Sequence, residues 1–265
     1  MTLGNILFIV EGGRAEPTFL KVLWNKFHPG VNYQIYSYNT NLSVLAKEYF
    51  ANGDFDEDLD LIKLLKEKGT DSKNNYVLNK VYQDIYLVFD LDPQSEIFDS
   101  NRISKLMNHF NDSAVNGKLY LSYPMLEAWK DIKKEHDPDF ENRAVDMKDI
   151  LSFKHTVNSD RYCWDRLRSY SKMDRSVFQT VIMYHLRKAN TIQTGRSENP
   201  ELNHYLNLDL IKLHSAQMDY LENENKILTL CTALFLVIEY EPRKFFTEIK
   251  TANTISETTM PDQQQ

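Results

Sequence analysis

The chain has 265 residues, a formal net charge of −7 and only two cysteines, Cys163 and Cys231. A net negative chain has no overall positive field, so a nucleic-acid partner would need a local basic surface or bound metal ions. Two cysteines without CxxC spacing exclude a cysteine zinc cluster and a disulfide framework, and they favour a reducing compartment. The first residues lack the basic segment of a signal peptide, and the most apolar window, Ile227 to Ile238, is shorter than the roughly 18 residues of a membrane span. We therefore expect a soluble, cytoplasmic protein.

The first half of the chain alternates predicted strands with predicted helices. Apolar runs indicate strands at residues 6–10, 33–38, 85–89 and 118–122. Apolar residues at helical spacing indicate helices at Phe19 to Phe27, Leu42 to Phe50, Leu59 to Lys68 and Ile103 to Phe110. Short loops and right-handed crossovers make this order an α/β layer. We expect a central, mainly parallel four-stranded sheet flanked by helices.

The pattern changes from about Asp137, beyond which we predict no further strand. Helical periods occur near residues 177–186, 205–221 and 227–238, and the last is apolar nearly all round, which indicates a core helix. Residues 251–265 are polar and lack periodicity, which is typical of a disordered tail. We therefore divide the chain into an α/β domain at 1–136, a mainly helical region at 137–250 and a tail at 251–265.

Acidic residues follow three of the predicted strands. Glu11 follows the first, Asp90 and Asp92 follow the strand at 85–89, and Glu127 lies just beyond the strand at 118–122, in the first turn of a predicted helix. Ligands of open α/β sheets bind in the crevice at the carboxyl ends of the strands. Carboxylate oxygens suit Mg²⁺ or Mn²⁺, and like charges gathered in one crevice are costly without a cation. We predict a metal site made by Glu11, Asp90 and Asp92, with Glu127 completing the catalytic set.

Each acidic residue also has a structural interpretation. Glu11 could be an ordinary polar strand terminus, and Asp90 and Asp92 could belong to a strand-to-turn transition that Pro93 ends. Glu127 could do no more than complement the dipole of its helix.

Substrate-binding candidates are Arg14 in the glycine turn, Glu16, and a basic stretch that contains Arg166, Arg168 and Lys172. Lys154 begins this stretch, and its aromatic residues are Tyr162, Trp164 and Tyr170. Basic residues neutralise phosphates and aromatic rings stack on bases, so the stretch is the best candidate for a nucleic-acid surface. The alternatives are a solvated helical face with core aromatics, a surface position for Arg14, and a helix-start role for Glu16.

The acidic motifs resemble those of the Toprim fold, which is shared by topoisomerases, bacterial primases and OLD-type nucleases. The matching segments are Val10-Glu11-Gly12 and Asp90-Leu91-Asp92. A narrower resemblance is to the RloB/AbiL-like Toprim proteins of bacterial defence neighbourhoods. Its motifs are similar to Glu11-Gly12 with Glu16-Pro17, to the segment from Ser122 to Trp129, and to Tyr170-Ser171-Lys172. The resemblance covers roughly residues 5–135, and Leu91 replaces an arginine that often follows the first aspartate in those proteins.

The resemblance implies a Toprim-like catalytic domain at 1–136 and a Mg²⁺- or Mn²⁺-dependent nuclease. Such an enzyme would cut DNA or RNA, tRNA among the candidates, as an effector of anti-phage defence. Asp90 and Asp92 would hold the metal, Glu11 would bind metal or act as general base or acid, and Glu127 would complete the shell. Nucleic acid is the implied partner, and a partner ATPase and a homo-oligomer are left open. The alternative is a catalytically silent Toprim-like module that binds nucleic acid or a partner ATPase.

Overall fold

The computed structural model describes residues 5–68, 76–159 and 161–258, the last seven of these by backbone alone. Its main sheet has six strands in the order β2-β1-β3-β5-β4, with β8 also pairing with β5. The four long strands are mutually parallel: β1 (Ile6–Val10), β2 (Tyr33–Ser37), β3 (Asp84–Asp90) and β5 (Gly117–Tyr123). They confirm the four predicted strands. The expected total of four is wrong, because two short strands run antiparallel to β5: β4 (Asn111–Asp112) and β8 (Leu230–Cys231).

The register of the parallel strands decides where their carboxyl ends lie. All five residues of β1 are buried, as its continuous apolar run predicts for a strand covered on both faces. Val10 pairs with Val88 on β3, and Asp90 pairs with Ser122 on β5. The carboxyl ends of β1, β3 and β5 therefore meet at one edge of the sheet.

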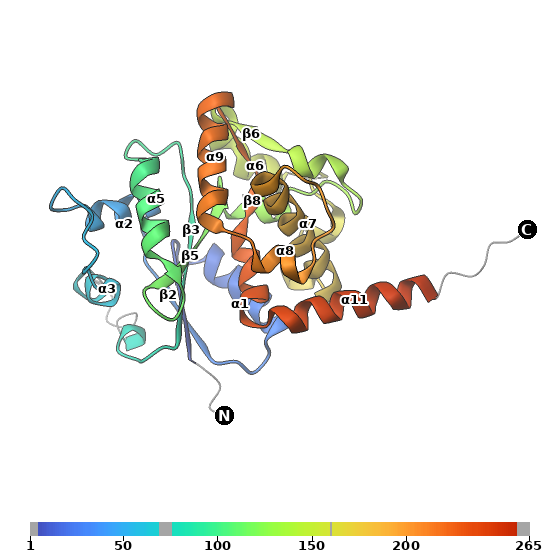
Figure 1. Ribbon diagram of the computed structural model, residues 1–265, viewed down its shortest axis with the longest axis horizontal. Coiled ribbons are helices and arrows are strands. Elements are labelled where there is room, and N and C mark those ends of the chain that lie inside the picture. The colour runs from blue at the N-terminus through green and yellow to red at the C-terminus, as the bar shows by residue number, and fades with distance from the viewer. Residues whose placement is uncertain (1–4, 69–75, 160, 259–265) are drawn as a thin grey trace, which may run out of the picture.

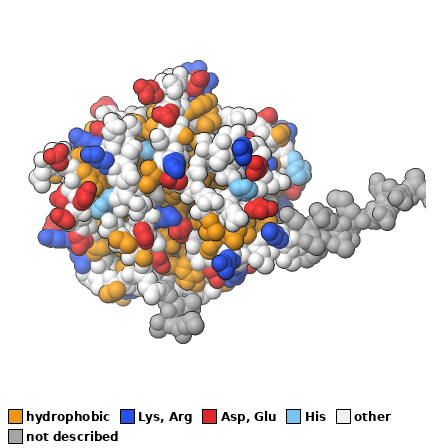
Figure 2. Space-filling view, viewed as in Figure 1, with side chains coloured by type: hydrophobic (Ala, Val, Ile, Leu, Met, Phe, Trp, Pro, Cys, Tyr) orange, Lys and Arg blue, Asp and Glu red, His pale blue; other side chains and the backbone are white. Residues whose placement is uncertain are grey.

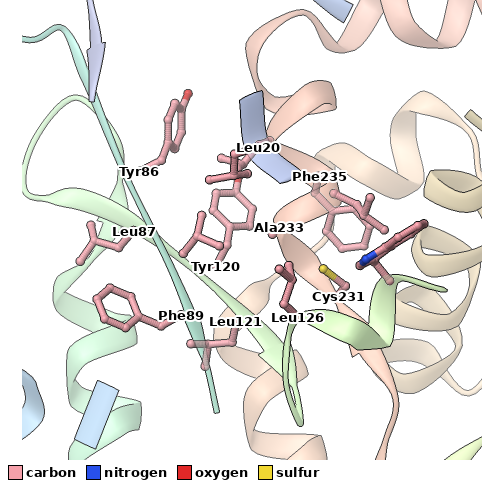
Figure 3. Packing of buried hydrophobic residues seen from close by; sticks show 14 of the residues in the cluster. Leu20, Tyr86, Leu87, Phe89, Tyr120, Leu121, Leu126, Cys231, Ala233 and Phe235 are labelled. Carbon is pink, nitrogen blue, oxygen red and sulfur yellow. The ribbon is translucent and has the colours of Figure 1, made fainter. Parts of the chain in front are cut away.

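Helices cover both faces of this sheet, which confirms the α/β layer (Figure 1). The flanking helices of the first half are α1 (Ala15–Phe27), α2 (Leu42–Tyr49), α3 (Leu61–Lys68) and α5 (Ser100–His109). In Figure 1, α2, α3 and α5 lie on one side of β3 and β5, and α1 lies on the other. Figure 3 shows the same division in the core: Tyr86 and Tyr120 point toward Leu20 of α1, whereas Leu87 and Phe89 point away from it.

The second half of the chain contains more strand and less regular helix than expected. Its elements up to α7 are η1 (Leu126–Lys130), η2 (Pro138–Asn142), β6 (Ala144–Asp146), η3 (Met147–Asp149), α6 (Ile150–Asn158), η4 (Asp165–Leu167), η5 (Tyr170–Lys172) and α7 (Arg175–Thr194), where η denotes a 3₁₀ helix. Those that follow are α8 (Leu202–Leu206), α9 (Leu210–Glu224), β7 (Lys226–Leu228), β8, η6 (Thr232–Phe235), α10 (Leu236–Tyr240) and α11 (Pro242–Thr258). The prediction of no strand beyond Asp137 is wrong, because β6 and β7 form a separate antiparallel pair and β8 joins the main sheet.

The predicted core helix at residues 227–238 is also wrong. This run forms β7, β8, η6 and the start of α10, and Leu230 and Cys231 are fully buried where β8 pairs with Ser122 and Tyr123 of β5. A continuous apolar run indicates burial but has no period, so it cannot distinguish a buried strand from a buried helix. Through β8, residues from the second half of the chain complete the main sheet.

The end of the chain differs from the expected disordered tail at 251–265. The backbone of α11 is helical to Thr258 and projects away from the body of the protein (Figure 1). Residues 259–265 lie outside the described residues. Within the described part of the chain, no helix combines the length and apolar character needed to cross a membrane.

His185 of α7 ties β8 to η1 and makes a testable contribution to stability. Its Nε2 lies 3.2 Å from the carbonyl oxygen of Trp129, and its Nδ1 lies 3.1 Å from the backbone nitrogen of Cys231. Nδ1 must therefore accept the Cys231 N–H, which requires a neutral ring. Burial lowers the pKa of His185 from 6.5 to about 3.

We expect the stability of the protein to fall with acidification below pH 6.5 partly because of His185. The unfolded chain binds a proton there that the folded chain rejects, so this residue contributes a loss of about 1.4 kcal/mol per pH unit down to about pH 4. Urea denaturation between about pH 7 and pH 4.5 measures the slope in wild type and His185→Gln. The variant should be less stable but lose this part of the slope, whereas replacing the exposed His136 with glutamine should leave it unchanged. Equal slopes in wild type and His185→Gln would contradict the expectation.

Candidate metal centre

The structure brings Glu11, Asp90, Asp92 and Glu127 to the same edge of the sheet. Glu11 directly follows β1, Asp90 ends β3, and Glu127 lies in η1 just beyond β5. The backbone N–H of Asp90 donates a hydrogen bond of 3.2 Å to Glu11 Oε2, which joins the carboxyl ends of β1 and β3. The charges of Glu11, Asp92 and Glu127 all act on Asp90. Adjacent parallel strands thus bring together, at one edge of the sheet, carboxylates from three separate segments of the chain.

The turn after β3 is held by hydrogen bonds to the next strand. The backbone nitrogen of Leu91 lies 3.0 Å from the carbonyl oxygen of Ser122 and 3.1 Å from that of Pro124. The N–H of Asp92 also donates to the Pro124 carbonyl oxygen, at 3.3 Å. Asp92 adopts a left-handed conformation with φ of 48°, which costs a non-glycine residue about 1 kcal/mol and persists where the surroundings determine it. Gln94 Nε2 donates to Asp92 Oδ1 at 3.0 Å and orients its carboxylate.

The cluster carries more negative charge than its surroundings balance. Burial, followed by the charge of Asp92, raises the pKa of Glu11 to about 8. Burial and the charges of Glu11 and Glu16 likewise raise the pKa of Asp90 well above its usual range. Clustered carboxylates of this kind are stabilised by a divalent cation, and their oxygens are the ligands that Mg²⁺ and Mn²⁺ prefer.

The chemistry of this donor set therefore fits the predicted metal. The side chains are not drawn together into a finished coordination shell: among residues 5–68, 76–159 and 161–258, no three His, Cys, Asp or Glu side chains are grouped so that they could hold a metal ion as they stand. The fit accordingly rests on donor type, burial and charge.

Lys154 of α6 belongs to this cluster, although the sequence places it only at the start of a basic stretch. Its Nζ lies 2.8 Å from Glu127 Oε1. That hydrogen bond, aided by the charges of Asp90 and Glu16, raises the pKa of Lys154. No local pattern links Lys154 to Glu127, because only the packing of α6 against η1 brings them together.

Glu16 lies at the edge of the cluster, and Arg14 lies outside it. A Cβ on Gly12 would come within 2.6 Å of Glu16 Oε2, so the missing side chain lets the glutamate fold back over the glycine turn. The charge of Glu16 acts on both Glu11 and Asp90. Arg14 is exposed at the start of α1, where its carbonyl oxygen accepts a hydrogen bond from the Thr18 hydroxyl.

The basic candidates of the second half are on the surface. Arg166 pairs with Asp174 at 2.6 Å and Arg168 pairs with Asp165 at 2.9 Å, both as exposed ion pairs of the kind that contribute little to stability. Lys172 is exposed at the end of η5.

The aromatic residues of this stretch are largely structural. Tyr170 packs edge-on against Phe19 and Trp129, and Tyr162 donates a hydrogen bond to Asp131. On the face drawn in Figure 2, acidic and basic side chains are interspersed rather than gathered into a field of one sign.

The fold and the cluster define an α/β protein with a group of acidic residues at the carboxyl edge of a mainly parallel sheet. Comparison with protein-family models, with curated proteins and with solved structures gives no match to this chain.

Proposed function

We propose that the protein is a Mg²⁺- or Mn²⁺-dependent nuclease of the Toprim type. The observation that carries this proposal is the gathering of Glu11, Asp90, Asp92 and Glu127 at the ends of three adjacent parallel strands. The motifs around these residues resemble Toprim motifs in order and spacing. A divalent cation held there would neutralise the charge that develops on a phosphoryl group during phosphodiester hydrolysis.

The acidic residues and Gln94 have separate roles at the metal site. Asp90 and Asp92 hold the cation, and Gln94 orients the Asp92 carboxylate. Glu11, positioned by the Asp90 N–H, binds metal or acts as general base or acid. Glu127 completes the shell.

The basic side chains of the protein bind the phosphate groups of the substrate. The Lys154 ammonium is close enough to the carboxylates to attract a substrate phosphate to them. Arg14, Lys172, Arg166 and Arg168 are exposed and free to exchange weak surface contacts for phosphate oxygens.

The biological role rests on the narrower resemblance. RloB/AbiL-like proteins occur in bacterial defence neighbourhoods, so we place this nuclease among anti-phage effectors, with DNA, RNA or tRNA as substrate. A partner ATPase is the candidate activator.

A cleavage panel tests the proposal. Plasmid DNA, single-stranded DNA, total RNA and tRNA are incubated with wild type and Asp90→Ala in Mg²⁺, Mn²⁺ or EDTA. We expect cleavage that needs the metal and disappears in the variant, because Asp90 is central to the cluster. Equal, metal-independent cleavage by Asp90→Ala would refute the assignment.

The second candidate is a catalytically silent Toprim-like module that binds nucleic acid or a partner ATPase. One contact favours it: the Lys154–Glu127 ion pair already supplies the cluster with a positive charge. The presence of Leu91, in place of the arginine common in RloB-like proteins, also favours this second function. A folded protein that binds nucleic acid or an ATPase, yet cuts nothing in the panel with or without that partner, would support this function.

A further inference from the structure

One side of helix α6 is exposed next to the acidic residues. The buried residues of α6 are Ile150, Phe153 and Val157, which pack into the core. A helix turns by about 100° per residue, so its exposed positions fall on the other sides. Four of them share one side, which we call the α6 face: Leu151, Lys154, His155 and Asn158.

Two contacts with η1 hold the α6 face at the carboxyl edge of the sheet. Lys154 Nζ lies 2.8 Å from Glu127 Oε1, and Asn158 Oδ1 accepts a hydrogen bond from Lys130 Nζ. Glu127 and Lys130 both belong to η1, which lies just beyond β5. The α6 face therefore borders the acidic residues at which we place the reaction.

The charge of the α6 face suits phosphate groups. The side chain of Lys154 is 61% exposed, whereas that of its partner Glu127 is only 12% exposed. Helix α6 contains no acidic residue. Asp149, which precedes the helix, lies on another side of it, where it lines a cavity together with Ser152 and Thr156. A phosphate that approaches the α6 face therefore meets the Lys154 ammonium first.

Leu151 gives the α6 face an apolar surface. Its side chain is 81% exposed, and it lies three residues before Lys154 and four before His155. Residues at these spacings are neighbours on a helix, with Cβ atoms about 5–6 Å apart. Apolar and imidazole side chains pack against the faces of unpaired bases, whereas the bases of a duplex are stacked on one another. A leucine and a histidine beside a phosphate-binding lysine therefore favour an unpaired strand.

We propose that the α6 face binds unpaired nucleotides next to the bond that is cut, so that the protein selects single-stranded nucleic acid over duplex. This inference rests on the proposed function and specifies its substrate. Lys154 binds a backbone phosphate, and Leu151 and His155 pack against the adjoining bases. Leu151 is then a specificity-determining residue, because its apolar side chain gains contacts only where a base is free of the stack.

Fluorescence anisotropy in EDTA at low ionic strength tests the proposal. The probes are fluorescein-labelled oligo(dT), oligo(U) and a DNA duplex of the same length. Wild type should bind at least one single strand more tightly than the duplex. Leu151→Ser should weaken that binding by about tenfold, which corresponds to about 1.4 kcal/mol, and should leave duplex binding unchanged. Lys154→Met should weaken both, because a phosphate contact does not depend on base pairing.

The matched control is Leu206→Ser, the same change at a leucine that is 60% exposed and lies beside Lys118, near the amino end of β5. This variant should bind every probe as wild type does, and thermal denaturation checks that each variant is folded.

Three results would overturn the proposal: no binding of either single strand to wild type, equal affinity of wild type for single strand and duplex, or wild-type affinities in Leu151→Ser. Because EDTA prevents metal-dependent cleavage, this test is separate from the cleavage panel. Selective binding without cleavage would leave the α6 face in place and refute the nuclease, whereas cleavage without an effect of Leu151→Ser would do the reverse.

Discussion

Replacing Asp90 with asparagine is expected to stabilise the metal-free protein and to abolish its thermal response to Mg²⁺. Asp90 lies among Glu11, Asp92 and Glu127, whose charges oppose its ionisation together with burial. An amide of nearly the same shape removes that repulsion and keeps the backbone N–H that orients Glu11. Removing such functional strain commonly raises stability by about 0.5–2 kcal/mol.

Thermal denaturation in EDTA and in Mg²⁺ measures both effects. Wild type should gain stability with Mg²⁺, as expected when a ligand binds only the folded state, and Asp90→Asn should not. Asp58→Asn, at an exposed acid between α2 and α3, should behave as wild type. If Asp90→Asn is less stable than wild type in EDTA, or still responds to Mg²⁺, then Asp90 is a structural residue of the strand end.

Replacing Lys188 with methionine is expected to destabilise the protein by about 2–6 kcal/mol, because each of two buried carbonyl groups that loses its donor costs about 1–3 kcal/mol. Lys188 of α7 is fully buried, and its Nζ donates to the carbonyl oxygens of Phe140 and Arg143 at 2.9 Å and 2.6 Å. Burial lowers its pKa, and the charge of the buried Asp131 works in the opposite direction. Methionine fills the space but leaves two carbonyl groups without this donor, and Asp131 loses one of its neighbouring cations.

Urea denaturation of Lys188→Met measures this loss. The matched control is Arg187→Gln at the adjacent position of α7, where the guanidinium makes a half-exposed contact of 3.8 Å with Glu141. That change should cost less than about 1 kcal/mol. Similar losses in both variants would mean that the buried ammonium has no special part in holding η2 and α7 together.

Local sequence patterns were sufficient for the four parallel strands of the sheet and for the acidic residues at its edge. The apolar runs at 6–10, 85–89 and 118–122 predict strands β1, β3 and β5 because strands covered on both faces are continuously apolar. Once those strands are parallel, residues just beyond their carboxyl ends must meet at one edge. Glu11, Asp90, Asp92 and Glu127 could therefore be grouped from chain order alone.

For the all-apolar run at 227–238, the local pattern does not predict the secondary structure. It predicts burial correctly but not conformation, because its strand β8 exists only through pairing with Ser122 and Tyr123, more than a hundred residues earlier. The polar composition beyond 251 likewise predicts a tail, whereas the backbone of α11 continues helical to Thr258. In neither segment does composition alone determine the conformation.

The sequence by itself determined the α/β class, the parallel strands and the acidic edge, since each depends on neighbours within a few residues. Only the tertiary structure placed Lys154 on Glu127 and set His185 between Trp129 and Cys231. These features come from segments distant in sequence that contact one another when α6 and α7 pack. Side chains brought together in that way share no spacing or period, so no local pattern could have revealed them.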